Sequence, residues 1–577
     1  MLNLTTKSNK KMKNKIYLLL GLLVALITSP GAGQDSRTWA TYYGGTANDG
    51  GFSVAVDTFG NVYLAGITLG SPGLAWQGFQ NTFGGGVVDA YLVKFDSSGN
   101  RLWATYYGGP GDEMAFFGGK MGVAADLSGN VYLAGFTTSA SGIASGGFQN
   151  TLGGTTANAY LVKFDASGNR IWGTYYGGTS ADKAYSVSTD ASGNIYIAGL
   201  ANSSGLASGG FQNTSGGLSD AFLVKFDTNG NRLWATYYGG SGTEEGYSVT
   251  TDNASNVYLA GMTSSSSAIA SGGFQNSYGG GSNDLFLVKF DSSGARLWAT
   301  YYGGTGDEML LFNGDMDVAC DASGNAFLTG LTTSASGISS GGFQNSYGGG
   351  GCDAFLVKFD AAGNRLWATY YGGNDDDKGY SAATDAAGNV FLAGRTDSYN
   401  AIASGGFQNA NGGPHDAFLV KFNPNGMRSC ATYFGGTDVD ECNAIAVDAL
   451  SNIYLGGNSA NTAGIAWNGF QNAHGGGTSD AFLVKFTSCP DVTNIEEISS
   501  ASNISVYPNP SGGNFMIKTN SLHDGTIYIF NTMSEMVYFS GNFSGEKEIN
   551  ISELKRGIYF LKISDRETTW AEKIIVR

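Results

Sequence analysis

The chain has 577 residues, of which 91 are glycine, 13% are aromatic and 14% are charged. This composition, with only eight prolines, argues against a proline-rich disordered chain and favours many short strands joined by tight turns. The formal net charge of −16 disfavours nucleic acid and anionic membrane surfaces as partners.

The N-terminus has the pattern of a signal peptide. Five lysines precede an apolar run of 12 residues, 16–27, whereas a membrane-spanning helix needs about 20. Small residues follow, so we predict a signal peptide over residues 1–33, cleaved between Gly33 and Gln34. The mature chain then has 26 basic and 47 acidic residues, no expected transmembrane span, and a charge of −21 that suits divalent cations or basic partners. A buried core helix is the alternative for residues 16–27.

Three short phrases then recur seven times in the same order. W-A-T-Y-Y-G-G or a close variant begins at Trp39, Trp103, Trp172, Trp234, Trp298, Trp367 and Cys430. G-F-Q-N begins at Gly78, Gly147, Gly210, Gly273, Gly342, Gly406 and Gly469. L-V-K-F places its lysine at Lys94, Lys163, Lys225, Lys289, Lys358, Lys421 and Lys485. Such long-period repetition predicts a repeat architecture.

Each repeat divides into four short strands. In the first full repeat we predict strands over Phe52–Asp57, Val62–Gly66, Ala90–Phe95 and Leu102–Tyr107. These segments are apolar or small on both faces, which indicates sheets packed between two neighbours, as in propeller blades. The turns between paired strands contain Asp, Gly and Asn, which supply side-chain hydrogen bonds and positive φ. A calcium loop in these turns is the alternative, although the EF-hand spacing is absent.

The ends of the repeat region suggest how the ring closes. The chain opens with a lone fourth strand, Arg37–Tyr43, and the last repeat has only three strands: Ala444–Asp448, Ile453–Gly457 and Ala481–Phe486. The first strand can complete the last blade, which gives seven blades and no open edge. An open solenoid is the alternative.

The combined pattern GFQN…DAFLVKF…GN…WATYYGG resembles the bacterial seven-bladed β-propeller (SBBP) repeat family over residues 37–487. The resemblance implies an all-β, seven-bladed propeller, four strands per blade, which we assign to residues 34–487. No general activity is attached to that family, so the resemblance implies a fold and not a function.

The longer loops, which contain G-F-Q-N or follow Y-Y-G-G, should all lie on one face. Four residues after the second glycine of Y-Y-G-G every repeat has an acid, and we expect these acids to form a ring near the central channel: Asp49, Glu113, Asp182, Glu244, Glu308, Asp377 and Asp440. One hypothesis is a site for a cation such as calcium, or for a basic ligand. We favour the other, in which each acid accepts N–H groups of its own loop, and we assign no cofactor. The seven lysines of L-V-K-F can likewise be paired lysines with buried stems.

Two repeats carry nearly identical insertions, residues 111–117 and 306–312, in blades two and five. Their apolar residues have no place in the repeat, so we predict an exposed contact surface, with a plug over the channel mouth as the alternative. The residues are Met114, Phe116, Phe117, Met309, Leu310, Leu311 and Phe312. The phenylalanines of G-F-Q-N are instead predicted to anchor their loops.

No catalytic motif is apparent. The chain has three histidines, and its five cysteines lack CxxC spacing, although a disulfide among Cys430, Cys442 and Cys489 remains open. The most irregular acidic segment is Asp375–Asp377, and we expect Arg395 to form an ion pair near it. We therefore predict a non-catalytic protein that binds a glycan, peptide or protein through the long-loop face. The alternatives are a propeller-type carbohydrate-active enzyme and a cation-stabilised scaffold.

The repeats end at Phe486. A polar linker, residues 488–503, precedes seven predicted strands of a small β-sandwich, residues 504–577. This segment resembles the type A sorting domain of the type IX secretion system through Pro508, Asn509, Pro510, Gly557 and Tyr559. The resemblance implies recognition by the type IX secretion machinery and a secreted protein, extracellular or attached to the outer cell surface. An unrelated immunoglobulin-like module is the alternative.

Overall fold

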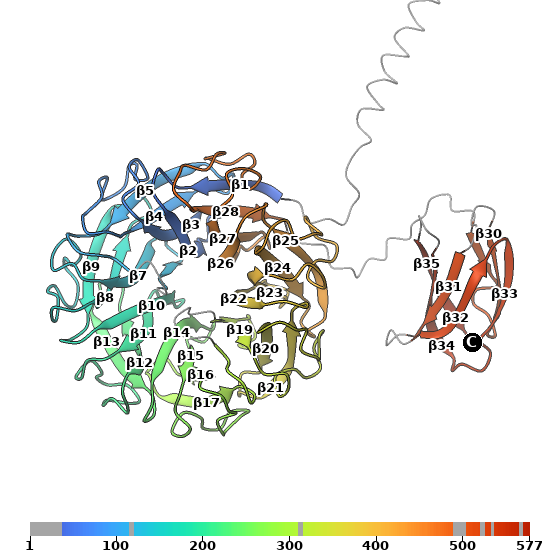
Figure 1. The fold of residues 1–577 in the computed structure, drawn as a ribbon. Helices are drawn as coiled ribbons and strands as arrows, with labels where there is room; N and C mark the ends of the chain where they lie inside the picture. Colours follow the sequence, from blue (N-terminus) through green and yellow to red (C-terminus); the bar gives the residue numbers. More distant parts are fainter. Residues whose placement is uncertain are drawn as a thin grey trace, which may run out of the picture. The chain divides into compact units, whose positions relative to one another are not determined.

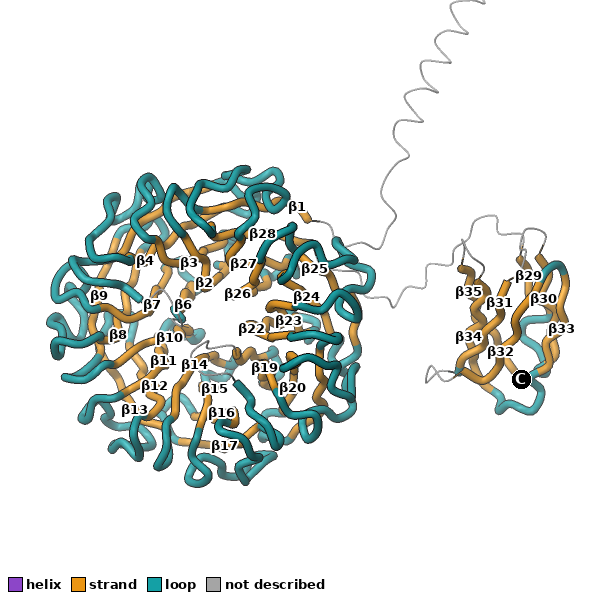
Figure 2. Tube along the Cα trace, viewed as in Figure 1, coloured by secondary structure: helices purple, strands orange, loops and turns teal. Residues whose placement is uncertain are grey.

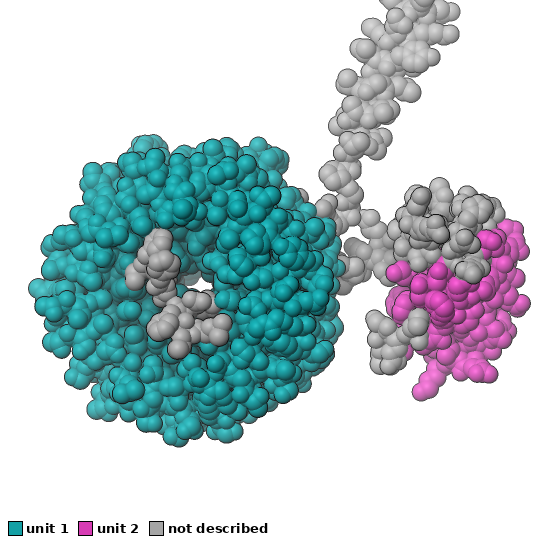
Figure 3. All heavy atoms as spheres, viewed as in Figure 1, with its two compact units in different colours: residues 1–490 teal, residues 491–577 magenta. Residues whose placement is uncertain are grey.

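The computed structural model describes residues 37–114, 120–309, 316–487, 504–519, 525–531, 536–564 and 569–577. The predicted signal peptide, its cleavage site at Gly33 and Gln34, and the linker lie outside these ranges. Every regular element within them is a β-strand, and they contain no helix long and apolar enough to cross a membrane. The chain forms two compact units that divide near residue 490 (Figure 3). Each unit is described by itself.

The first unit consists of seven four-stranded antiparallel sheets arranged around a central opening (Figure 1, Figure 2), which confirms the predicted propeller. In order from the innermost strand outward, blades 1 to 4 are β2 (Asp49–Val56), β3 (Val62–Thr68), β4 (Asp89–Phe95), β5 (Arg101–Tyr107); β6 (Gly122–Ala125), β7 (Val131–Thr137), β8 (Asn158–Phe164), β9 (Arg170–Tyr176); β10 (Asp182–Thr189), β11 (Ile195–Ala201), β12 (Asp220–Phe226), β13 (Arg232–Tyr238); and β14 (Glu244–Thr251), β15 (Val257–Thr263), β16 (Asp284–Phe290), β17 (Arg296–Tyr302).

Blades 5 to 7 follow the same plan. They are β18 (Met316–Cys320), β19 (Ala326–Thr332), β20 (Asp353–Phe359), β21 (Arg365–Tyr371); β22 (Asp377–Thr384), β23 (Val390–Thr396), β24 (Asp416–Phe422), β25 (Arg428–Phe434); and β26 (Asp440–Val447), β27 (Ile453–Ser459), β28 (Asp480–Phe486), β1 (Arg37–Tyr43).

The first strand closes the ring as predicted. β1 is the outermost strand of blade 7 and pairs antiparallel with β28, with Trp39 opposite Lys485 and Tyr43 opposite Ala481. The predicted innermost strands begin too late: β2 begins at Asp49 rather than Phe52, because Asp49 already pairs with Thr68 of β3. Apart from such ends, the predicted strands of the first and last repeats are correct.

The long loop between the second and third strands protects the outer edge of each blade. In blade 1, Trp76 exchanges both backbone hydrogen bonds with Ala104 of β5, and the amide of Tyr106 donates to the carbonyl of Gln80. The Gln80 side chain holds the loop further, because its Oε1 accepts from the amide of Gly108 at 3.2 Å. The G-F-Q-N segment therefore covers the strand edge on which another chain could otherwise pair.

Neighbouring blades are joined by the repeated tryptophan. The Trp103 indole of blade 1 lies against Gly168 in the last hairpin of blade 2, where a Cβ atom would come within 2.8 Å of the ring. Its Nε1 donates to the carbonyl of Ala166 at 3.0 Å. This glycine is thus required by a close approach as well as by its φ of 84°.

The second unit is a small β-sandwich. One sheet consists of β29 (Ile504–Tyr507), β30 (Asn514–Thr519) and β33 (Glu546–Asn550). The other has the order β32 (Met536–Phe543), β31 (Gly525–Phe530), β34 (Gly557–Ser564), β35 (Thr569–Val576). Both sheets contribute to one core, with Ile517 and Ile549 from the first and Ile529 and Leu561 from the second. All seven predicted strands are present, with ends shifted by a few residues.

Candidate functional site

The seven repeated acids lie at the junctions between blades, where the chain enters each innermost strand. Their side chains are buried, with exposed fractions of 0–2%, and none of them lines the central cavity. Each accepts a hydrogen bond from its own loop: Asp182 Oδ2, for example, accepts from the amide of Gly178 at 2.8 Å. These contacts agree with the hypothesis that each acid accepts N–H groups of its own loop. The acids lie at the start of the innermost strands, but their side chains do not line the cavity.

Burial changes the acidity of several of these groups. Loss of hydration raises the pKa of Glu113 and of Glu308 to about 8, and that of Asp377 to about 6. Hydroxyl donors oppose the shift, since Ser139 and Thr137 both donate to Glu113 Oε1. Among the described residues, no group of three or more His, Cys, Asp or Glu side chains is placed to hold a metal ion.

The repeated lysines are also buried between blades. Lys94 Nζ lies 3.6 Å from Asp57 Oδ2 and 5.0 Å from the centre of the Tyr63 ring, and it donates to the carbonyl of Ala166 in blade 2. Asp57 in turn accepts from the amides of Phe59 and Asn61 in its own turn. The acceptor atoms of this turn are therefore occupied by N–H groups, as in an Asx turn.

The phenylalanines of G-F-Q-N act as anchors between blades. Phe79 of blade 1 packs near Phe164 of blade 2, and the guanidinium carbon of Arg170 lies 4.4 Å from its ring centre. Cation–π contacts of this kind recur around the propeller, and they pair Arg37 with Phe407, Arg101 with Phe470, Arg170 with Phe79, Arg232 with Phe148, Arg296 with Phe211, Arg365 with Phe274, and Arg428 with Phe343. Each of these phenylalanine rings thus has an arginine guanidinium over one face.

Two of the predicted contact residues in the insertions, Met114 and Met309, lie within the described residues, and both differ from the prediction. Met114 and Met309 are buried, each with an exposed fraction of 2%, within the same core cluster as Met121 and Val318. The prediction that they are exposed is wrong, because they fill the inner layer where other blades have residues of a longer innermost strand. Phe116, Phe117, Leu310, Leu311 and Phe312 lie outside the described residues.

The central channel contains a cavity of about 230 Å³ lined by innermost strands of all seven blades. A β-bulge in several of these strands turns an additional side chain toward it, as at Tyr185 and Tyr247. These two rings stack with centres 5.1 Å apart, and both hydroxyls donate to Glu245 Oε2. Inside the channel, serine hydroxyls join the blades: Ser53 Oγ accepts from the amide of Val123 in blade 2.

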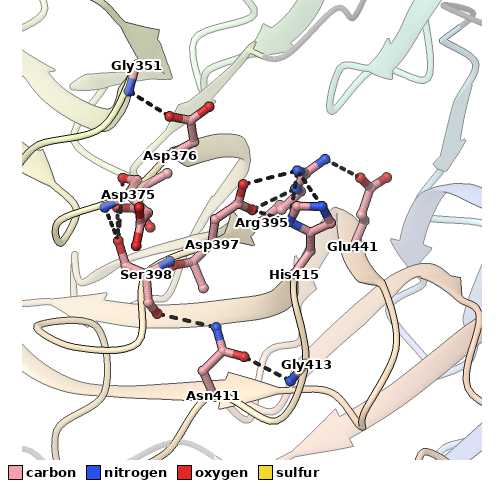
Figure 4. A network of polar contacts seen from close by, with 12 residues as sticks. Gly351, Asp375, Asp376, Arg395, Asp397, Ser398, Asn411, Gly413, His415 and Glu441 are labelled. Atoms are coloured by element: carbon pink, nitrogen blue, oxygen red, sulfur yellow. Dashed lines mark hydrogen bonds and ion pairs between the residues drawn. The ribbon is translucent and has the colours of Figure 1, made fainter.

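One charged network breaks the repeat on the long-loop face (Figure 4). Arg395 near the end of β23 donates to Asp397 at 3.1 Å and to Glu441 of blade 7 at 3.0 Å. His415 contacts Asp397 and Arg395, with its Nδ1 atom 2.5 Å from Asp397 Oδ1 and 2.9 Å from Arg395 Nη2. The side chains keep 20–29% of their surface exposed.

Sequence reasoning missed this arrangement in part. Arg395 forms its ion pairs with Asp397 and Glu441 rather than with Asp375–Asp377, and in the register of β22 and β23 it lies opposite Lys378. A signal was available: the residues equivalent to Arg395 in blades 1 to 5 are apolar and buried, namely Ile67, Phe136, Leu200, Met262 and Leu331. An arginine in that position needs acidic partners nearby.

Among the cysteines, Cys430 forms a disulfide, whereas Cys320 and Cys442 are free thiols. A disulfide that includes Cys442 is therefore wrong. Cys489, the fifth cysteine, lies outside the described residues. Cys430 replaces the repeated tryptophan in blade 6. The neighbouring blade 7 has no hairpin between its third and fourth strands, because its fourth strand is β1, from the start of the repeat region.

Comparisons with known proteins agree with both units. The beta-propeller repeat family (SBBP) matches residues 38–73, 171–207, 233–267 and 431–462. The secretion system C-terminal sorting domain family matches residues 505–577.

Individual relatives are more distant. An uncharacterized WD repeat-containing protein of Acanthamoeba polyphaga mimivirus, L264, is 24% identical over 75% of this chain and 37% of its own length. The regulatory protein FlaEY of Caulobacter vibrioides is 28% identical over 54% of this chain and 33% of its own length. The chain thus spans about a third of each of these relatives. Among solved structures, PorZ, a surface component of the type IX secretion system of Porphyromonas gingivalis, aligns over 91% of this chain and 70% of its own, at 13% identity and a TM-score of 0.27.

The repeat matches, the seven blades and the sorting domain, which marks the protein for secretion to the cell surface, lead to one assignment. The chain is a secreted protein that contains β-propeller repeats of the SBBP family and a C-terminal type IX sorting domain.

Proposed function

We propose that the propeller is a non-catalytic binding module that holds a glycan, peptide or protein partner on its long-loop face, at blades 6 and 7. The observation that carries this proposal is the network of Arg395, Asp397, His415 and Glu441. It replaces an apolar layer with fixed, partly exposed hydrogen-bonding groups in one part of an otherwise repetitive ring. Function is commonly found on such loops, supported by a rigid scaffold.

An exposed aromatic residue lies in the same loop. Tyr399 has an exposed fraction of 66%, and its hydroxyl donates to the carbonyl of Gly413 at 3.2 Å, which fixes the ring. An exposed aromatic ring in the loop that also carries the Asp397 carboxylate and the His415 imidazole suits the apolar face and the hydroxyl groups of a sugar, so a glycan is the ligand class we favour.

The test is a glycan array with the purified full chain, followed by calorimetry on any glycan that binds. We expect binding to be lost in Tyr399→Ala and in Arg395→Leu, which restores the residue found at Leu200 and Leu331. Leu218→Ser, on the long loop of blade 3, is the matched control because Leu218 is 82% exposed and far from the network in the ring. Equal binding by all variants would refute this site.

The alternative is a carbohydrate-active enzyme, in which Asp397 and Glu441 act as paired carboxylates. It predicts release of reducing ends from a bound polysaccharide, and loss of that release in Glu441→Gln with binding retained. Binding without release would favour the binding module.

A further inference from the structure

Pairs of buried carboxyl groups meet at six of the seven blade junctions. In each pair one group is the repeated acid that leads into a blade, and the other is the aspartate that begins the third strand of the preceding blade. Both are almost fully buried. The pairs are Asp480 with Asp49, Asp89 with Glu113, Asp220 with Glu244, Asp284 with Glu308, Asp353 with Asp377, and Asp416 with Asp440.

In five of the six pairs the two groups face the same glycine, and in the sixth Asp49 interacts electrostatically with Asp480, which faces Gly44. At the junction of blades 1 and 2, a Cβ atom on Gly108 would lie 2.3 Å from Asp89 Oδ1 and 2.4 Å from Glu113 Oε2. The same arrangement recurs at Gly303, with 2.4 Å to both Asp284 Oδ1 and Glu308 Oε2. Two acidic oxygens from different blades are therefore held next to each other over a glycine Cα.

In every pair the Oδ1 atom of the strand aspartate lacks a donor, and in the three Asp–Asp pairs the Oδ1 atom of the loop acid (Asp49, Asp377 or Asp440) lacks one as well. Glu113 is satisfied by the hydroxyls of Thr137 and Ser139 and by the amide of Gly109. Asp89 Oδ2 accepts from the amide of Gly84, but Asp89 Oδ1 is buried with no hydrogen-bond partner. The corresponding Oδ1 atoms are unpartnered in the same way at Asp220, Asp284, Asp353, Asp416 and Asp480.

At the junction of blades 1 and 2, no cationic side chain among the described residues is found to interact with Asp89 or Glu113. The titratable groups that interact with Asp89 and Glu113 are Asp112 and the phenols of Tyr106, Tyr107, Tyr160 and Tyr175. Two ionised carboxylates in such a site would be buried charges of the same sign, which is strongly unfavourable. The closing junction differs, because His474 Nδ1 lies 3.8 Å from Asp480 Oδ2.

The seventh junction, between blades 2 and 3, shows which kind of group satisfies the position of the unpartnered aspartate oxygen. Blade 2 has Asn158 instead of aspartate, and it is the Asn158 Nδ2 atom that faces Gly177, at 2.4 Å from a Cβ position there. Its Oδ1 accepts from the amide of Gly153, as Asp89 Oδ2 does from Gly84, and its Nδ2 donates to the carbonyl of Gly178 at 3.1 Å. The atom equivalent to the unpartnered aspartate Oδ1 is thus a hydrogen donor in blade 2.

We propose that each of the six carboxyl pairs binds one proton at neutral pH, held between the strand aspartate and the loop acid as a hydrogen bond that joins two blades. The proton supplies the donor that Oδ1 lacks and removes one of two adjacent charges. Burial accordingly raises the pKa of Asp89 to about 6 and that of Glu113 to about 8. A metal ion fits less well at the pair of Asp89 and Glu113, because N–H and O–H groups already point at both oxygens of Glu113.

This arrangement links folding to pH in one direction. The folded propeller retains protons that the unfolded chain releases above the ordinary carboxyl pKa of about 4. The contribution of the pairs to the stability of the folded state is therefore fully present below that pH. It decreases as the pH rises toward about 8, the pKa of Glu113 and Glu308, and does not change further above that value.

The test uses infrared spectroscopy and thermal unfolding of the full chain. At pH 7 we expect a carbonyl stretch of protonated carboxylic acid, which decreases stepwise in Asp89→Asn and in Asp89→Asn with Asp284→Asn. We also expect Tm to fall by several degrees from about pH 5.5 to about pH 8.5, and to fall less in these variants. Asp96→Asn is the matched control, because Asn423 occupies that turn position in blade 6.

Asn158→Asp is the converse variant, which creates a seventh pair, strengthens the band and steepens the fall of Tm with pH. It keeps the test valid if Asp89→Asn does not fold. Absence of the acid band at pH 7, or a Tm that rises over this pH range, would overturn the proposal. A Tm that rises with calcium at pH 8 while the band is absent would assign the pairs to a cation instead.

Discussion

The contact between the repeated tryptophan and the next blade predicts that blade junctions hold much of the stability of the ring. We take Trp103→Ala as the perturbation. Trp103 is 3% exposed, packs near Tyr63 and Phe164, and donates to the carbonyl of Ala166. Truncating a buried tryptophan costs about 3–5 kcal/mol. The carbonyl of Ala166 keeps Lys94 Nζ as a donor, so we expect the free energy of unfolding to fall by about 3–5 kcal/mol.

The assay is guanidinium unfolding followed by tryptophan fluorescence and far-UV circular dichroism. Leu102→Ala is the control, because Leu102 precedes Trp103 in the same strand but is 40% exposed, and it should cost no more than about 1 kcal/mol. Gly168→Ala should destabilise the protein through the opposite partner of the same contact, since its Cβ atom would meet the indole. A loss below about 1 kcal/mol for Trp103→Ala would refute the reasoning.

Three further predictions concern the closure, the acids and export. Peptide mapping without reductant should link Cys430 to Cys489, and Cys430→Ser should lower stability by about 2–4 kcal/mol; an unlinked Cys489 peptide would contradict this. Calcium added to chelator-treated protein at neutral pH should not raise Tm, because a backbone amide already donates to one oxygen of each loop acid; a rise abolished by combined Asp182→Asn, Asp377→Asn and Asp440→Asn would identify a cation site. Removal of residues 504–577 should leave a folded propeller that is not exported, and its appearance outside the cell would show that the sorting domain is dispensable.

Much of the fold was predictable because the same strand pattern recurs seven times in the sequence. Four strands per repeat and a lone strand at the start determine the pairing of β1 with β28, since only that pairing leaves no edge exposed. The sandwich was predictable from alternating apolar residues such as Phe515 and Ile517. Boundaries were less accurate, because Asp49 belongs to β2 through backbone pairing that its polar side chain does not reveal.

The candidate sites were harder to predict, since their chemistry depends on contacts between repeats. Nothing in the sequence near Glu113 indicates that Asp89, in a different blade, faces the same glycine. Met114 appeared to have no place in the repeat, but β6 is shorter than the equivalent strands and leaves room for it in the core. A repeat pattern shows which residues recur, whereas burial and partners across a junction determine what each residue does.

Some residues that differ from the repeat pattern are explained by a change in the structure around them, and others are not. Cys430 replaces a tryptophan where the neighbouring blade has no hairpin to receive the indole, and Asn158 supplies a hydrogen where the other blades need a proton. Arg395 has no such explanation: blade 6 has its hairpins and loops, and five other blades place an apolar residue in the same position. Exchanging a buried apolar side chain for an ion pair seldom increases stability. This is the reason for our proposal that the arginine and its partners serve a ligand at blades 6 and 7.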